Sequence, residues 1–350
     1  MSNGMKENPL EALYAFFEEE TKETVVFDLE WNQNGYAPNL RMPHEIIEIG
    51  ACRLNDRGEV TDRFSELIRP RLYRRVDKHI RQVTGITEQE LSSGRTFPEV
   101  FADFARFCGE SAQLITWGRD DYPVLRRNLE YYMQPSPFSP PLDAQLVFGF
   151  AHFGDAHRQM NLHAALEETG TQLEVPAHRA VYDAECTAAL LPAVSAGLEG
   201  LGEEKRNELS AILEREKRIA DSVLRSRPTH YSVHTDALRD DAVTNLLCPL
   251  CGRKMSFAVA WFDAGRDRYE AIGRCEQHGQ AHGQMHLKRG TNGYLTMHQR
   301  VFLASDDEVK AVSEAYRLFL LTPPAKRHHR LCMEEVRRVS ERQNFPSKKG

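Results

Sequence analysis

The sequence predicts an α/β fold in the first part of the chain, in which a mixed sheet is flanked by helices. In residues 1–200, short apolar strand-like runs come first and amphipathic helical segments are interleaved with later runs. The chain is also too long, at 350 residues, for one ordinary domain. A cysteine-histidine cluster in its last third indicates a second, smaller and β-rich domain.

Four strands are expected in the first part of the chain. The apolar runs that predict them are residues 24–27, 45–54, 64–68 and 114–117. The first run ends at Asp28, so we expect this acid at the end of a strand. Because successive strands are separated by polar or glycine-containing segments, each run is predicted as one strand of a common sheet.

Helices are expected between and after these strands. Thr96 and Glu99 form a capping box that opens a helix, and Phe101 and Phe104 then lie on one face of it. Further helices are expected at residues 122–133, 161–169, 182–191 and 203–225. The last of these is rich in charged residues and is predicted to be an exposed connector.

These elements divide the chain into four predicted segments. Residues 1–200 form the α/β domain, 201–228 a helical connector, 229–303 a small β domain, and 304–350 a helix followed by a basic tail. Residues 255–262 and 269–273 alternate as strands do, and the turn between them is expected at 263–267.

Composition indicates a cytoplasmic protein without a membrane partner. Hydrophobic residues make up 41% of the chain, yet no run approaches the ~20 apolar residues of a membrane span. The first residues lack the basic-then-apolar pattern of a secretory signal. The seven cysteines are an odd number, and their spacing favours a metal site or reduced thiols over a secreted disulfide framework.

With a net charge of −6, the chain as a whole is not a polycation, which argues weakly against binding to nucleic acid. A net charge does not reveal local patches, however. One basic stretch spans residues 69–81, where six Lys and Arg residues face a single acid, Asp77. A second basic stretch spans residues 326–349. Such stretches suit the backbone of a nucleic acid, although a solvated charged face would have the same composition.

Acidic residues follow two of the predicted strands and open two of the predicted helices. Asp28 and Glu30 are two residues apart, so in a strand their side chains project to one face. Asp121 follows the strand at 114–117, and His178 precedes Asp183 by five residues. Each feature alone has a simpler explanation, because acids are common at strand exits and at helix N-termini. Their combination favours a catalytic site.

Taken in order, these residues resemble the motifs of the DEDDh exonuclease family. Residues 43–50, 84–87 and 161–166 also match that family, and the resemblance covers residues 22–195. The motifs that carry it are Asp28-x-Glu30, Trp117-Gly-x-x-Asp121 and His178-x-Ala180-x-x-Asp183. The resemblance implies an RNase H-like fold and a 3′–5′ exonuclease that hydrolyses phosphodiester bonds.

The resemblance also implies roles for the individual residues. Asp28 is expected to bridge two divalent cations, Glu30 and Asp183 to support the ion on the side of the nucleophile, and Asp121 to hold the other. Two Mg²⁺ or Mn²⁺ ions suit oxygen ligands and in-line phosphodiester hydrolysis. The imidazole of His178 titrates near neutrality and can accept the proton of the attacking water.

Other acids lie close to these in the sequence. Asp120 is adjacent to Asp121, but the Trp-Gly-x-x-Asp spacing selects Asp121. Asp143 is expected to cap a helix that starts at residue 144. Glu185 is interpreted as an acid in the first turn of a helix, and Glu48 as a strand residue.

The motifs resemble the KapD-like exoribonuclease branch of the family more than its proofreading members, so RNA is slightly favoured over DNA. The expected partner is a single strand, bound by Arg74 and Arg75 through its phosphates, with Trp31 stacking on a base. Packing of Trp31 in the core is an equal alternative. Two other functions stay open: a DNA repair or proofreading exonuclease, and a non-catalytic adaptor that binds nucleic acid.

The second domain carries two Cys-x₂ pairs, each followed by Gly, which resemble the knuckles of a zinc ribbon. Cys248 and Cys251 form the first pair, and Cys275 and His278 the second, after 23 intervening residues. A single structural Zn²⁺ is predicted, with reduced thiols and no metal as the alternative. His282 or His286 could replace His278 (a choice the spacing leaves open).

The closed set of four ligands predicts a role in stability rather than in catalysis. The domain around it could bind either nucleic acid or a protein partner, and the loop at residues 288–293 would suit a strand. The remaining cysteines have no ligand spacing and are predicted to be core or incidental thiols: Cys52, Cys108, Cys186 and Cys332.

Overall fold

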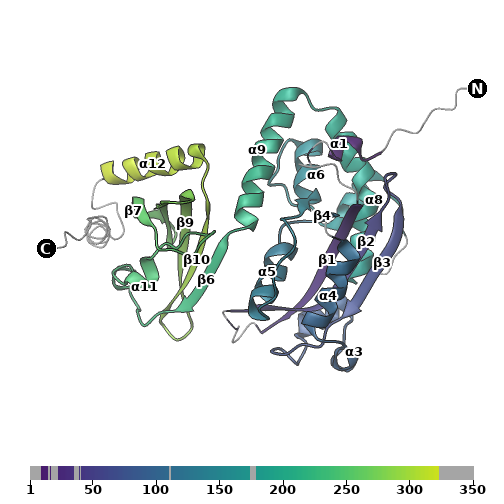
Figure 1. Cartoon of the computed structure of the whole chain (residues 1–350), viewed down its shortest axis with the longest axis horizontal. Helices are drawn as coiled ribbons and strands as arrows, with labels where there is room; N and C mark the ends of the chain where they lie inside the picture. Colours follow the sequence, from purple (N-terminus) through teal and green to yellow (C-terminus); the bar gives the residue numbers. More distant parts are fainter. Residues whose placement is uncertain are drawn as a thin grey trace, which may run out of the picture. The chain divides into compact units, whose positions relative to one another are not determined.

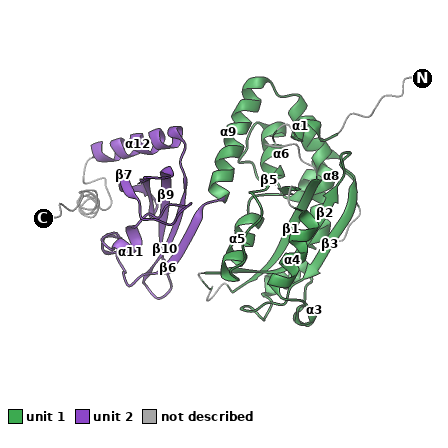
Figure 2. Ribbon diagram, in the orientation of Figure 1, with its two compact units in different colours: residues 1–220 green, residues 221–350 purple. Residues whose placement is uncertain are grey.

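The computed structural model describes residues 9–14, 16, 23–34, 39, 41–109, 112–173 and 179–322. The chain divides into two compact units, residues 1–220 and 221–350, shown in different colours in Figure 2. His178, Cys332 and the basic stretch at 326–349 lie outside the described residues. The finer division into four segments stays a prediction.

Unit 1 is built on a five-stranded mixed sheet (Figure 1). Its order is β3-β2-β1-β4-β5, in which β1 pairs antiparallel with β2 and parallel with β4. The predicted mixed sheet is therefore confirmed. The strands are β1 (Glu23–Gln33), β2 (His44–Leu54), β3 (Val60–Leu67), β4 (Ala112–Thr116) and β5 (Leu142–Asp143).

The helices of unit 1 flank this sheet and follow the predicted pattern of interleaving. They are α1 (Glu11–Tyr14), α2 (Lys78–Thr84), α3 (Glu88–Ser93), α4 (Phe97–Cys108), α5 (Asp121–Tyr131), α6 (Ala144–Phe153), α7 (Leu162–Thr169), α8 (Ala180–Glu199) and α9 (Glu203–Ala220). The predicted capping box is confirmed, because the carboxylate of Glu99 accepts hydrogen bonds from the backbone and hydroxyl of Thr96.

Strand β1 separates two layers of apolar packing. Its residue Val26 joins a cluster with α1, α6, α7 and α8 on one side of the sheet. Phe27 and Leu29 join a second cluster with α4 and α5 on the other side. Because side chains alternate along a strand, Asp28 and Glu30 share the face of Val26, toward α8.

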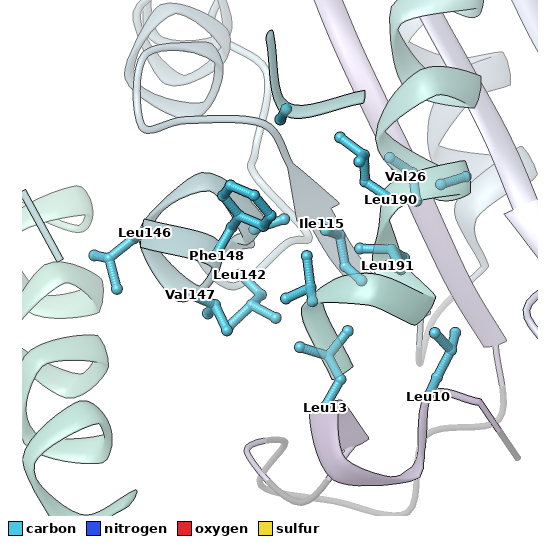
Figure 3. Packing of buried hydrophobic residues seen from close by; sticks show 14 of the residues in the cluster. Leu10, Leu13, Val26, Ile115, Leu142, Leu146, Val147, Phe148, Leu190 and Leu191 are labelled. Carbon is cyan, nitrogen blue, oxygen red and sulfur yellow. The ribbon is translucent and has the colours of Figure 1, made fainter. Parts of the chain in front are cut away.

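The packing around Val26 is shown in Figure 3. Side chains from α6 and α8, including Phe148 and Leu191, meet Val26 and Ile115 of the sheet there. All four are completely buried. The two layers together hold β1 from both faces, so the backbone that carries the acids has little freedom to move.

Two sequence predictions about β1 and α9 are wrong in their bounds. Strand β1 does not end at Asp28 but runs on to Gln33, because its later residues continue to pair with β2 as far as His44. The helix predicted at 203–225 ends at Ala220, and residues 223–228 are a strand. Pairing of that strand with β10 outweighs its local helical pattern.

Unit 2 contains a five-stranded antiparallel sheet in the order β6-β10-β9-β8-β7. A turn joins β7 and β8 where the sequence predicts one, but it is shorter than the predicted 263–267: β7 runs on to Gly265, and Arg266 and Asp267 form the turn with positive φ. The elements are β6 (Val223–Pro228), α10 (His234–Ala237), α11 (Asp241–Thr244), β7 (Ser256–Gly265), β8 (Arg268–Cys275), β9 (Gly279–Arg289), β10 (Leu295–Leu303) and α12 (Asp306–Leu321).

A separate core holds unit 2 together. Trp261 is completely buried, and its indole N–H donates to the carbonyl of Thr244 at 2.7 Å. On α12, Tyr316 and Phe319 pack on Phe262 of β7. In the described part of the chain, no helix has the length and apolar character that crossing a membrane requires.

Helix α8 approaches β2 at Gly50 more closely than any side chain would permit. A Cβ added to Gly50 would lie 2.0 Å from the backbone nitrogen of Val181 and 2.1 Å from the carbonyl carbon of Ala180. Gly50 pairs with Asp28 across the sheet. The absence of a side chain at this position therefore lets the first turn of α8 contact β2 directly beside Asp28 of β1.

We predict that Gly50→Ala destabilises unit 1 by about 3 kcal/mol or more, because the new methyl group meets backbone rather than a mobile side chain. Differential scanning calorimetry should show a lower melting temperature for the transition of unit 1. Gly200→Ala is the matched control, since nothing lies within 4 Å of a Cβ there and its φ is −75°. Equal melting temperatures for both variants would contradict the role assigned to Gly50.

Candidate active site and candidate metal centre

Three carboxylates converge where β1 meets the first turn of α8. Asp28 and Glu30 come from β1 and Asp183 from α8, and their ligand oxygens all lie within 4.8 Å of one another. Each of the three is partly accessible to solvent. Carboxylate oxygens at this spacing are the donors that Mg²⁺ or Mn²⁺ prefers, so the residues fit a divalent cation.

Asp121, the fourth predicted acid, is placed differently. It opens α5, is only 6% exposed, and its Oδ1 accepts a hydrogen bond from the backbone N–H of Leu29 at 3.1 Å. It is not one of the three mutually close carboxylates, but it is the charged neighbour that acts most strongly on Asp28. Asp28 is therefore influenced by Asp121 as well as by the two carboxylates of the cluster.

The electrostatics of these acids reflect burial and mutual repulsion. Burial, followed by the charge of Asp121, raises the pKa of Asp28 well above its usual range. Burial, followed by the charge of Asp183, raises the pKa of Glu30 to about 8. Burial raises the pKa of Asp121 to about 7, against the hydrogen bond from Leu29. A bound cation would remove this penalty by favouring the ionised carboxylates.

Two acids near Asp121 have other positions. Asp120 is exposed, so the structure turns Asp121 rather than its neighbour toward β1. Asp143 caps α6 as predicted, accepting from the backbone N–H of Leu146 at 3.1 Å. It also accepts from the N–H of Gly118 at 3.0 Å and so supports the turn that leads to Asp121.

Glu48 has a function that the sequence interpretation missed. Its carboxylate is completely buried and forms a bidentate pair with Arg179, at 2.6 and 3.0 Å, and it also accepts from the N–H of Ala180. Arg179 directly follows His178 and precedes α8. The pair therefore anchors the start of α8, and with it Asp183, to β2. The Glu-x-Gly spacing of Glu48 and Gly50 is the local signal that could have indicated this contact.

His178, the predicted general base, lies outside the described residues. The predicted contacts with nucleic acid are partly described. Arg74 and Arg75 are exposed on the segment before α2. Trp31 is half-buried, packs against the cluster around Phe27, and has its ring centroid 6.0 Å from that of His44.

The cysteine-histidine cluster of unit 2 is assembled from the ends of two hairpins. The Sγ of Cys251 lies 3.8 Å from that of Cys275, and Nδ1 of His278 lies 3.5 Å from Cys248 and 3.6 Å from Cys275. A tetrahedral zinc ion separates two sulfur ligands by about 3.8 Å and a sulfur from a nitrogen by about 3.6 Å. The four side chains therefore fit zinc.

The two alternative histidines lie elsewhere. His282 and His286 are on β9, outside this cluster, and His282 has its Nε2 3.8 Å from a carboxylate oxygen of Glu270. Gly252 and Gly279, which follow the two pairs, adopt φ of 68° and 78°. Cys52, Cys108 and Cys186 are buried core thiols, as predicted.

Comparison with known proteins identifies unit 1. A family model described as Exonuclease (RNase_T) matches residues 25–191. The "Probable 3'-5' exonuclease KapD" of Bacillus subtilis is 29% identical over 171 residues, which cover 47% of this chain and 80% of that protein. A PolC-type DNA polymerase III of Clostridium perfringens is 30% identical over 169 residues, which cover 48% of this chain but 11% of the polymerase.

Among solved structures, the nuclease domain of 3'hExo, a DEDDh family member bound to rAMP, is 21% identical and covers 53% of this chain and 96% of its own, with a TM-score of 0.45. A zinc-bound complex of Escherichia coli ExoI with single-stranded DNA is 15% identical and covers 71% of this chain and 54% of its own, with a TM-score of 0.41.

Residues 25–191 are therefore an exonuclease domain. The RNase H-like α/β fold and the enzyme class predicted from the sequence are confirmed. The family acts on nucleic acid and implies divalent cations, in agreement with the convergent carboxylates. The individual catalytic residues stay a prediction.

The Glu48–Arg179 pair leads to a prediction about stability. Arg179→Ala should destabilise unit 1 by about 3 kcal/mol, because it leaves a buried carboxylate without its cation. Adding Glu48→Gln should recover part of this loss, since the buried charge is then removed. Denaturant unfolding measures both. Arg81→Ala, which breaks an exposed pair with Glu88, is the control and should change stability by less than about 1 kcal/mol. A double variant no more stable than Arg179→Ala would refute this account.

The raised pKa of Glu30 leads to a prediction about pH. In the metal-free protein, the folded form keeps the proton of Glu30 up to about pH 8, whereas the unfolded chain releases it near the ordinary value of 4.5. Stability without divalent cations should therefore fall as pH rises between these values. The melting temperature of unit 1, measured at several pH values in buffer without added divalent cations, tests this. Glu30→Gln should make the dependence shallower without abolishing it, because Asp28 and Asp121 also have raised pKa values; an unchanged slope would contradict the assignment.

Proposed function

We propose that the chain is a metal-dependent 3′–5′ exonuclease that hydrolyses single-stranded nucleic acid from its 3′ end, with RNA favoured over DNA. The observation that supports this most is the convergence of Asp28, Glu30 and Asp183 inside an exonuclease domain. The direction of hydrolysis is inferred from the motifs and from the name of the KapD relative. A cytoplasmic location belongs to the same proposal and rests on the spacing of the cysteines.

The proposed mechanism distributes the acids over two cations. Asp28 would contribute to holding both ions, Glu30 and Asp183 would hold one of them, and Asp121, positioned by its hydrogen bond from Leu29, would support the other. When bound, the two ions would neutralise charge on the phosphate and activate the attacking water. His178 is proposed to accept the proton of that water. Neighbouring Arg179 would help by restricting the backbone next to His178.

A DNA exonuclease is the second candidate. The relatives of the PolC type, which are named as DNA polymerases, match the same half of this chain. The preference for RNA rests on the motif residues at 43–50 and on Trp117-Gly118, which resemble the exoribonuclease branch. The catalytic acids do not distinguish the two sugars, because a 2′-hydroxyl would be recognised by the surroundings of the terminal nucleotide.

The proposed substrate contacts are electrostatic and aromatic. Arg74 and Arg75 would bind phosphates of the single strand, since both are exposed. Trp31 follows Glu30, and the register of β1 shifts between these two residues. Such a bulge can re-aim a side chain, so the half-buried Trp31 could contact a base beside the acids.

For unit 2 we propose one structural zinc ion held by Cys248, Cys251, Cys275 and His278, as in a zinc ribbon. The support is the agreement of three ligand separations with a tetrahedral site. Four protein ligands leave no position for water, so this ion would stabilise the fold rather than catalyse. The surface of unit 2 would then bind nucleic acid or a protein partner.

We predict that the protein, with Mg²⁺ or Mn²⁺, shortens 5′-labelled single-stranded RNA and DNA from the 3′ end, RNA faster. Asp28→Ala should reduce the rate by at least about a thousandfold, because the bridging ligand is lost, and His178→Ala should lower kcat while metal binding persists. Asp120→Ala, an exposed neighbour, is the control and should behave as wild type. A wild-type rate of hydrolysis for Asp28→Ala would contradict the assignment of the catalytic site. If the unmodified protein binds strands but does not cleave them, the result would favour the non-catalytic adaptor.

We predict that purified protein contains one zinc per chain, measured by inductively coupled plasma mass spectrometry. Cys275→Ser should remove the metal and unfold unit 2, because the ligands of a structural zinc contribute directly to folding. Cys186→Ser, a buried thiol of unit 1, should keep the metal. Folded unit 2 without any bound metal would show that the cluster is a set of reduced thiols.

A further inference from the structure

A cavity of about 570 Å³ lies in unit 1 beside the basic segment 69–77. Helices α3 and α4 contribute to its walls, together with the end of α5. Its lining combines positive charge with aromatic surface. The residues that matter here are Arg69, Arg71, Arg74, Glu88, Phe97 and Tyr132.

The segment that carries the arginines is held rigidly by a buried carboxylate. Glu45 of β2 is 1% exposed and accepts backbone hydrogen bonds from Arg71 at 2.6 Å, from Leu72 at 2.9 Å and from Tyr73 at 2.7 Å. The hydroxyl of Tyr132 donates to the same carboxylate at 3.3 Å. The carboxylate of Glu45 therefore accepts hydrogen bonds from backbone N–H groups of the segment and not from the guanidinium groups of its arginines.

A second buried residue ties the segment to the strand of the active site. The amide of Asn32 donates to the carbonyl oxygens of Tyr73 and Arg75, both at 2.8 Å, and its Oδ1 accepts from the N–H of Asp77 at 2.9 Å. Asn32 is completely buried and lies two residues beyond Glu30 in β1. Two strand residues span about 7 Å, so the later part of the segment, residues 73–77, is tied to β1 close to the predicted catalytic acids.

The positive charges of the cavity have no ionic partner. Within the described part of the chain, no residue forms an ion pair or a side-chain hydrogen bond with Arg69, Arg71 or Arg74, and all three are exposed. The acid in the lining, Glu88, is already engaged, with Arg81 at 3.5 Å and with the N–H of Val76 at 3.2 Å. Such pre-positioned, unpaired guanidinium groups are suited to phosphate.

The lining of the cavity also contains aromatic side chains. The rings of Phe97 and Tyr132 are stacked, with centroids 5.1 Å apart and an interplanar angle of 20°. Phe97 is almost completely buried and supports the half-exposed Tyr132 from behind. Phosphate-binding groups and an aromatic ring in the lining of one cavity match the two parts of a nucleotide, its phosphate and its base.

We propose that this cavity binds one nucleotide of the substrate strand, upstream of the terminal nucleotide. Arg71 and Arg74 bind its phosphate, and Tyr132 contacts its base. This inference rests on the proposed exonuclease function and adds a second, non-catalytic contact to it. The cavity is distinct from the predicted Arg75 contact, since Arg75 does not line it.

The test measures the binding of 5′-fluorescein-labelled oligouridylate and oligothymidylate, each at lengths of about four and about ten nucleotides. The full-length protein carries Asp28→Ala, which prevents cleavage of the strands. Fluorescence anisotropy is measured over a range of salt concentrations. Adding Arg71→Gln/Arg74→Gln should weaken binding of the longer strands about tenfold at low salt. The salt slope should fall by about 0.7, because the contact with one phosphate of a single strand is lost.

Arg57→Gln/Arg106→Gln is the matched control, since it removes the same charge from exposed positions elsewhere in unit 1. Competition by AMP shows whether the cavity binds a free nucleotide or a nucleotide that is part of a strand. Weaker AMP binding with unchanged binding of strands would assign the site to free nucleotides and overturn the strand contact. Unchanged binding of both would overturn the cavity as a nucleotide site.

Hydrolysis by the unmodified protein is a separate readout. If no strand is cleaved, the proposed function fails while the binding comparison still decides the cavity. If strands are cleaved but the arginine variants bind as the control does, only the cavity is refuted.

Discussion

The convergence of like-charged carboxylates is the constraint on which unit 1 depends. Asp28, Glu30 and Asp183 repel one another at short range, and burial raises the pKa of the first two. They remain together because their backbones are held from outside the site, by apolar packing on both faces of β1 and by the approach of α8 at Gly50. The folded chain thus stores an unfavourable arrangement of charge that a divalent cation can relieve.

Buried polar residues of β1 and β2 extend this scaffold to the surroundings of the site. Glu48 anchors the residue that follows His178, whereas Glu45 and Asn32 anchor the basic segment beyond the same end of the sheet. Each is buried and each finds partners more than 25 residues away in the sequence. A buried carboxylate or amide is tolerated only when such partners are present, so these residues specify the position of loops as well as the fold.

The two predicted metal sites differ in the chemistry of their donors. In unit 1 the donors are carboxylate oxygens, partly accessible to solvent, which suit hard cations and leave room for water and a phosphate. In unit 2 they are three sulfurs and one imidazole nitrogen at tetrahedral separations, a closed set that suits zinc. Catalysis and structural support are thereby assigned to different units of the chain.

Local order along the chain was sufficient for much of this architecture. The apolar run at 45–54 predicts β2, alternation at 269–273 predicts β8, and the capping box at Thr96 predicts α4, because these signals depend on near neighbours. The order of the acidic motifs along the chain indicates the exonuclease domain through its resemblance to a known family. The end of α9, the extension of β1 and the Glu48–Arg179 pair were decided by tertiary structure. Pairing of β6 with β10 and burial of Glu48 involve residues at least 68 positions apart, so no local periodicity can indicate them. The acids first identified by their order in the sequence thus become a site only through the close contact of β2 with α8.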